Sequence, residues 1–132
     1  MIQFKKEDIE VLIEHSKEEA PFEACGILAG KEGKVAKVYR MQNSDRSPAT
    51  FFMEPKEQLK VMKEIRNLGL EMLGIYHSHV ATEAYPSAHD VELAFYPEAS
   101  YVIISLKDKD NPNIRSFKIV DGKITEEKVL SF

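Results

Sequence analysis

The apolar residues of the chain follow two spacings, one typical of helices and one typical of strands. Near the start, Ile9, Leu12 and Ile13 recur at intervals that predict a helix with one apolar face, closed by Pro21. The spacing then changes: "ACGILAG" is a short apolar run and "KVAKVYRM" alternates, with the turn residues "KEG" between them. The segment 24–41 is therefore predicted to form a β-hairpin.

A second helix is predicted between Pro55 and Gly69. Leu59, Met62 and Ile65 recur three residues apart and would form a common apolar face against the core. Proline is favoured in the first turn of a helix and glycine just after its end, so these two residues mark the boundaries. The preceding segment, 42–54, is rich in turn residues and ends in the brief extended piece "TFFME".

The second half of the chain mixes strands with one short helix. The predicted elements are the strand "LEMLGIYHSHV" with its first half buried, the helix "PSAHDVELAFYP" stopped by Pro97, the strand "SYVIISLK" with Val102 and Ile104 in the core, and a hairpin over 113–132 turning at Asp121–Gly122. Tight turns between several strands favour antiparallel pairing. We therefore expect an α/β (α+β) fold with a mixed, mainly antiparallel sheet flanked by helices, in one domain over 1–132.

Composition and charge narrow the classes of function. The chain has a net charge of −4, and its lysines lie among acidic residues, as in "KKED" and "KDKD". Such a surface argues against nucleic-acid binding, which needs a dense basic patch. The single cysteine, Cys25, excludes an intrachain disulfide and is expected to pack in the core, and no apolar run approaches the roughly 18 residues of a membrane span. We expect a cytoplasmic protein with no membrane segment.

The stretch "YHSHVATEAYPSAHD", residues 76–90, carries the candidate chemistry. His77 and His79 would project from the same side of a strand, where two imidazoles can hold one divalent metal ion. The pair alone is a weak signal, because such pairs occur on many strands and a zinc site needs a third ligand. His89 should face elsewhere on its helix, and His15 is expected at the surface.

Three metal-binding patterns begin with two histidines at this spacing. The metallo-β-lactamase-like pattern HxHxDH is excluded by Ala81 and Thr82. A cupin pattern needs a glutamate at position 83, which is present. It also needs a glycine at position 71, where the chain has Glu71, and a later histidine, but no histidine follows His89. The third pattern, HxH followed by seven residues and then SxxD, is complete.

Ser87 and Asp90 have two compatible interpretations. Ser-x-x-Asp is a capping box, in which the two side chains satisfy free N–H groups at a helix start. A helix beginning beside the strand end would also aim Asp90, from its first turn, at the point where His77 and His79 converge. Two imidazoles, one carboxylate and an open fourth position are the layout of a catalytic zinc site.

Together with an upstream glutamate, these residues resemble the JAMM (MPN+) metalloproteases. "APFEACGILAG" is similar to the family's glutamate-bearing segment, "GIYHSHVATEAYPSAHD" to its metal segment and "SYVIISLKDKDNPNIRSFKIVDG" to its closing strands. One departure is Val80, where most members have a proline that shapes the loop and ligates nothing. The resemblance implies a curved mixed sheet and hydrolysis of peptide or isopeptide bonds, often at the C-terminal tail of a ubiquitin-like protein.

The resemblance also implies a role for each motif residue. The implied ligands of one Zn²⁺ ion are His77, His79 and Asp90. Glu23, which the residues alone do not distinguish from Glu19 or Glu83, would act as general base toward a zinc-activated water and pass the proton to the leaving amine. Ser87 would donate a hydrogen bond to the developing oxyanion.

The chain has no long insertion and looks like the compact prokaryotic members. For these the resemblance implies a ubiquitin-like or sulfur-carrier protein with a Gly-Gly tail as partner; a homodimer is compatible with the sequence. The alternative is a catalytically inactive MPN-type scaffold or a ubiquitin-like-binding module, but all five motif residues are retained. Asn43 is interpreted as a turn residue, with a place in the substrate groove as the alternative.

Overall fold

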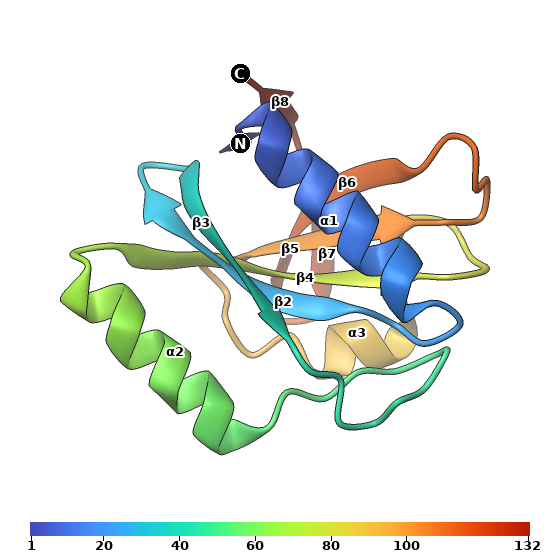
Figure 1. The fold of residues 1–132 in the computed structure, drawn as a ribbon, viewed down its shortest axis with the longest axis horizontal. Coiled ribbons are helices and arrows are strands. Elements are labelled where there is room, and N and C mark those ends of the chain that lie inside the picture. The colour runs from blue at the N-terminus through green and yellow to red at the C-terminus, as the bar shows by residue number, and fades with distance from the viewer.

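A computed structural model describes residues 1–132, and one eight-stranded sheet runs through them (Figure 1). The strands in chain order are β1 (Ile2–Phe4), β2 (Cys25–Lys31), β3 (Lys34–Met41), β4 (Glu71–His79), β5 (Ser100–Ser105), β6 (Asn113–Val120), β7 (Lys123–Glu127) and β8 (Val129–Ser131). The helices are α1 (Lys6–Glu19), α2 (Pro55–Asn67) and α3 (Ala88–Glu92). No helix is both long and apolar enough to cross a membrane.

The sheet order is β7-β6-β5-β4-β2-β3-β1-β8. Four neighbouring pairs are antiparallel, and three pairs, β4–β5, β1–β3 and β1–β8, are parallel. The expected mixed, mainly antiparallel sheet is confirmed, as are the hairpins β2–β3 and β6–β7. β1 and β8 were not expected, and their pairing brings the two chain ends together (Figure 1). Strands of three residues are too short to show an alternating pattern.

The sheet separates two apolar clusters, one on each face. α1 covers one face, where its Leu12 packs in a cluster with Tyr76, Val102 and Ile104. α2 and α3 lie on the other side (Figure 1), where Ile65 belongs to a cluster built on alternate residues of β2, β4 and β5. Because side chains alternate along a strand, the histidines at the end of β4 face the same side as α2 and α3.

Three local expectations were wrong. Leu59 is 57% exposed, because a residue six positions before Ile65 lies about 120° around the helix from it and points off the packed face. α3 ends at Glu92 rather than just before Pro97, and Phe95 is exposed. β4 is buried in its second half, not its first, since that half lies between β2 and β5 and beneath the flanking segments.

Candidate metal centre and active site

Three side chains converge where β4 ends. His77 and His79 leave the same side of the strand and are 2% and 5% exposed, and Asp90 comes from the first turn of α3. The two Nε2 atoms lie 3.1 Å apart, and each lies 3.1 Å from the Oδ2 atom of Asp90. The structure therefore brings together the three side chains that were predicted as metal ligands.

The capping box of α3 sets the direction of Asp90. The Ser87 hydroxyl accepts a hydrogen bond from the Asp90 N–H at 3.1 Å, and Asp90 Oδ2 accepts one from the Ser87 N–H at 2.9 Å. The capping box is therefore confirmed, and it directs the Asp90 carboxylate toward the two histidines. The Ser87 oxygen acts as an acceptor in this contact, so its own proton stays free for another partner.

The surroundings of the two imidazoles orient their Nε2 atoms toward Asp90. The Glu83 carbonyl can only accept, so His79 Nδ1–H donates to it at 2.8 Å. The ring of His77 stacks on Phe51, with centroids 4.7 Å apart and planes 25° apart. Val80, where most family members have proline, directly follows the last residue of β4, and the His79 carbonyl accepts a hydrogen bond from the Leu106 N–H at 2.9 Å.

The donor set fits a divalent metal ion. A tetrahedral ion with bonds of 2.0–2.1 Å would hold its ligand atoms about 3.3 Å from one another, close to the spacing of these three atoms. When both histidines are neutral and carry the proton on Nδ1, two lone pairs and a carboxylate face one point with no donor between them. Such an arrangement calls for a cation, and it leaves a fourth position for a further ligand.

The pKa shifts of the three side chains also fit a bound cation. Burial lowers the pKa of His77, which favours the neutral, ligating form. Burial alone would raise the pKa of Asp90, but hydrogen bonds with His77 and His79 outweigh it and hold that pKa far below its usual range. The pKa of His79 is raised despite burial, because Asp90 and the Glu83 carbonyl stabilise a positive charge. A metal ion would supply that charge in place of a proton.

Glu23 lies beside this cluster, in the segment between α1 and β2. Its neighbour Ala24 is fixed to β4 by two hydrogen bonds. The Ala24 N–H donates to Ser78 Oγ at 2.8 Å, and the Ser78 N–H donates to the Ala24 carbonyl at 3.0 Å. The Glu23 side chain is 3% exposed, and its Oε1 atom has no hydrogen-bond partner. Glu19 and Glu83 are exposed, so burial beside the cluster singles out Glu23.

The position of Glu23 changes its acidity. Burial raises its pKa to about 8, the positive charge that His79 can carry opposes this rise, and the negative charge of Asp90 adds to it. A buried carboxylate with a raised pKa beside a cluster of this kind is a candidate proton carrier. Its role as general base and the role of Ser87 at an oxyanion stay predictions.

Other candidate residues lie apart from the cluster. His89 is half-buried and contributes no atom to it. Cys25 is buried as expected, and burial raises the pKa of its thiol to about 12, which disfavours the nucleophilic thiolate. The surface position expected for His15 was wrong: the residue is 3% exposed, and its Nδ1 atom lies 2.7 Å from the Tyr76 hydroxyl on the α1 face. The sequence does not show this pair, because its partners are 61 positions apart.

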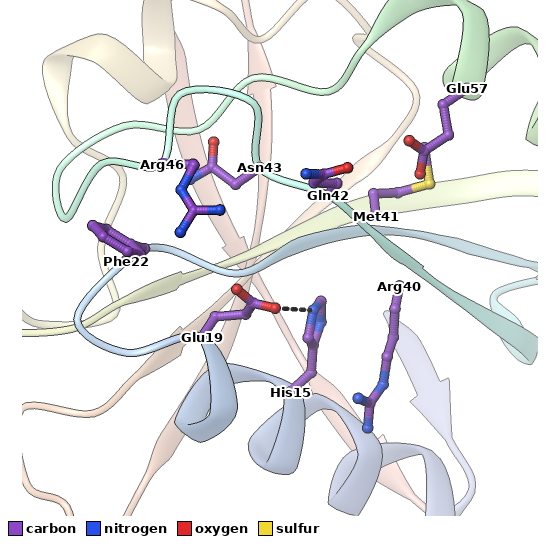
Figure 2. Close-up of a pocket in the computed structure, with 9 residues that line it drawn as sticks. All are labelled: His15, Glu19, Phe22, Arg40, Met41, Gln42, Asn43, Arg46 and Glu57. Atoms are coloured by element: carbon purple, nitrogen blue, oxygen red, sulfur yellow. Dashed lines mark ion pairs between the residues drawn. The ribbon is translucent and has the colours of Figure 1, made fainter.

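A polar cavity of about 480 Å³ lies where the ends of α1 and β3 meet the loop after β3 (Figure 2). His15, Glu19, Arg40 and Arg46 are among its lining residues, and His15 Nε2 lies 3.8 Å from Glu19 Oε1. None of the three cluster side chains lines this cavity. Its positive and negative side chains are mixed, so it does not select a ligand of one charge.

Comparison with known proteins decides the family. The family model of prokaryotic homologues of the JAB domain matches residues 5–120, which is most of the chain. The chain belongs to this family. The resemblance of the sequence to the compact prokaryotic JAMM proteins is therefore confirmed. The chain is a JAMM-type hydrolase.

Two relatives of the chain carry the names CysO-cysteine peptidase and desampylase. The CysO-cysteine peptidase of Mycobacterium tuberculosis is 43% identical over 123 residues, which are 92% of this chain and 84% of that protein. The desampylase of Pyrococcus furiosus is 38% identical over 108 residues, which are 82% of this chain and 75% of that protein.

Solved structures share the JAMM fold. The solution structure of a protein from Desulfitobacterium hafniense has a TM-score of 0.91 and 42% identity, covering 100% of this chain and 93% of that one. A JAB1/MPN domain protein from Archaeoglobus fulgidus has a TM-score of 0.67 at 15% identity, covering 99% of this chain and 97% of that one. The second likeness concerns the fold alone, and it confirms the predicted fold class.

Proposed function

We propose that the protein is a zinc-dependent peptidase that cleaves a peptide or isopeptide bond at the C-terminus of a ubiquitin-like or sulfur-carrier protein. The observation that carries the proposal is the convergence of His77, His79 and Asp90 at mutual distances of 3.1 Å, with the buried carboxylate of Glu23 beside them. The names of the two relatives, a CysO-cysteine peptidase and a desampylase, support this class of substrate.

Two imidazoles and a carboxylate are a ligand set used for catalytic zinc, with one position left open. A zinc ion there would polarise the scissile carbonyl and lower the pKa of a water molecule. The residues of the chain orient this site: the Glu83 carbonyl fixes the ring of His79, Phe51 supports the ring of His77, and the capping box fixes Asp90.

Glu23 acts as the proton carrier of the reaction. Its carboxylate accepts a proton from the attacking water and delivers it to the leaving amine. Burial without a hydrogen-bond partner strengthens its affinity for that proton, and the charge of a bound cation would oppose this effect in place of the charge on His79. A group that must both take up and return a proton near neutral pH needs this balance.

Ser87 stabilises the charge that develops on the substrate carbonyl oxygen. Its hydroxyl proton is free, because the oxygen already accepts the Asp90 N–H. Its side of the site is open, since Ser87 is exposed while the metal-binding side chains are buried. A Gly-Gly tail suits such a site, because a main chain without bulky side chains can approach the buried ligands closely.

Residues 1–132 form one domain in this proposal, because a single sheet includes both the first and the last strand. A reducing, cytoplasmic location fits the single buried thiol of Cys25. The alternative, an inactive scaffold or a ubiquitin-like-binding module, has no need for an unpartnered buried carboxylate beside three converging ligands.

Candidate ubiquitin-like proteins that carry an extension after a C-terminal Gly-Gly provide the test. They are incubated with the zinc-loaded protein, and the products are weighed by mass spectrometry, with Glu23→Gln as the control. Release of the extension after Gly-Gly by the wild type and not by Glu23→Gln is the expected result. Zinc binding without any cleavage would support the binding module, and undiminished cleavage by Glu23→Gln would remove the proposed base.

A further inference from the structure

The loop between β3 and α2, residues 42–54, contacts both the proposed base and a metal-binding histidine. The Glu23 N–H donates to the Ser47 carbonyl at 2.9 Å, and the Glu23 carbonyl accepts from Asn43 Nδ2 at 3.0 Å. Both main-chain groups of Glu23 are therefore held by this one loop. The same loop supplies Phe51, which stacks on the ring of His77.

Asn43 organises this loop through its side chain. Its Nδ2 donates to the carbonyls of Glu23 and Thr50, both at 3.0 Å. Its Oδ1 accepts from the N–H groups of Asp45 at 3.0 Å and Phe52 at 3.1 Å. The amide is 8% exposed and makes all these bonds with main-chain groups. The bond to Asp45 belongs to a local turn, the bonds to Thr50 and Phe52 close the far end of the same loop, and the bond to Glu23 joins the loop to the segment before β2.

A further contact joins the loop to the segment before Glu23. The guanidinium of Arg46 lies over the ring of Phe22, 5.4 Å from its centroid, and Figure 2 shows the two side chains next to each other with Asn43 on the same loop. The Glu23 side chain itself makes no hydrogen bond through Oε1. Because the carboxylate lacks that anchor, its position depends on how firmly the main chain is held.

We propose that Asn43 is a positioning residue for catalysis, which holds the main chain of Glu23 so that its carboxylate stays aimed at the metal site. This inference rests on the proposed function, in which Glu23 carries the proton. Asn43 does not touch the metal ligands or the reacting atoms. Asparagine suits the position because a single side chain must give two donors and an acceptor, whereas aspartate would set an oxygen against two carbonyl oxygens.

The test uses Asn43→Ala, with Asn43→Ser as a milder variant in case the first does not fold. Thr50→Val is the matched control, because it removes the exposed bond between Thr50 Oγ1 and Asp45 in the same loop and leaves the bonds to Glu23 in place. For each zinc-loaded protein, kcat, KM and zinc content are measured on an extended ubiquitin-like substrate. The exchange rate of the Glu23 amide proton is measured by NMR.

The proposal predicts that kcat of the Asn43 variants falls by about 10- to 100-fold with KM within about twofold, since small displacements of a reacting group have effects of this size. Zinc content stays at one per chain, the Glu23 amide exchanges at least about tenfold faster, and Thr50→Val resembles the wild type. An unchanged Glu23 exchange rate, or a fall in kcat that only matches lost zinc or lost folded protein, would overturn it. If the wild type cleaves nothing, the proposed function fails, while the exchange rate still reports whether Asn43 holds Glu23.

Discussion

The Ser87 hydroxyl is predicted to have two separable roles, one in folding and one in catalysis. Ser87→Ala removes an N-cap, which costs about 1 kcal/mol of stability for a typical helix. The same change removes the proposed donor to the oxyanion, and the loss of one such donor lowers kcat by about 10²- to 10³-fold, or about 2.7–4 kcal/mol. The bond from the main-chain N–H of residue 87 to the Asp90 carboxylate does not use the Ser87 side chain, so the variant keeps it and should keep its metal.

The assay separates the two effects by comparing three variants. Urea unfolding gives the stability, and cleavage of an extended ubiquitin-like protein gives kcat. Ser87→Gly should lose as much kcat as Ser87→Ala but only a few tenths of a kcal/mol, because glycine is a tolerable N-cap. Ser87→Thr keeps a hydroxyl and should retain most activity. If Ser87→Ala binds zinc and keeps its full kcat, the hydroxyl is only a cap and the oxyanion role is refuted.

Three further predictions follow from the buried groups. Zinc at about 100 times its dissociation constant should raise the free energy of unfolding of the wild type by about 2.7 kcal/mol. Calorimetric unfolding of Asp90→Asn at the same zinc concentration should show no such gain. An equal gain in that variant would contradict the assignment of Asp90 as a ligand. In the metal-free protein, burial raises the pKa of Glu23 from 4.5 to about 8, so folding favours the protonated form and the wild type loses stability as pH rises between these values. Thermal melts of Glu23→Gln and wild type should therefore nearly coincide at about pH 4 and diverge toward pH 9 in favour of the variant, and a gap independent of pH would refute this. Gly26→Ala should destabilise the fold by about 1–3 kcal/mol or more in urea, because the added Cβ collides with the Tyr76 ring and the Tyr39 carbonyl; a loss below about 0.5 kcal/mol would show that this packing relaxes freely.

Much of the fold follows from local patterns in the sequence. The spacing of Ile9, Leu12 and Ile13 correctly predicts α1, and Pro55 correctly marks the start of α2. The prediction that Leu59 packs in the core was wrong, because the spacing of apolar residues does not define which of them contact the sheet. β1 and β8 were not predicted, because each forms a strand only by pairing with a distant segment. Three residues are also too few to show an alternating pattern.

The candidate site shows the same division between local and distant information. His77, His79 and Asp90 are close in sequence, so their spacing on a strand and a capped helix predicts that they converge. Glu23 is more than fifty positions away, and only the family resemblance pointed to it. The bond between Asn43 and Glu23 spans 20 positions, so the sequence, which shows a loop rich in turn residues, does not reveal that this loop lies against the proposed base.

The dependence of cleavage on zinc tests the central claim most directly. Zinc is titrated into metal-free wild type and metal-free Glu23→Gln, while bound zinc and release of a C-terminal extension from a Gly-Gly-bearing ubiquitin-like protein are measured together. Both proteins should bind one zinc per chain, and only the wild type should gain activity, which saturates at that ratio. Cleavage that persists in the metal-free wild type, or that rises equally with zinc in Glu23→Gln, would contradict the proposed mechanism.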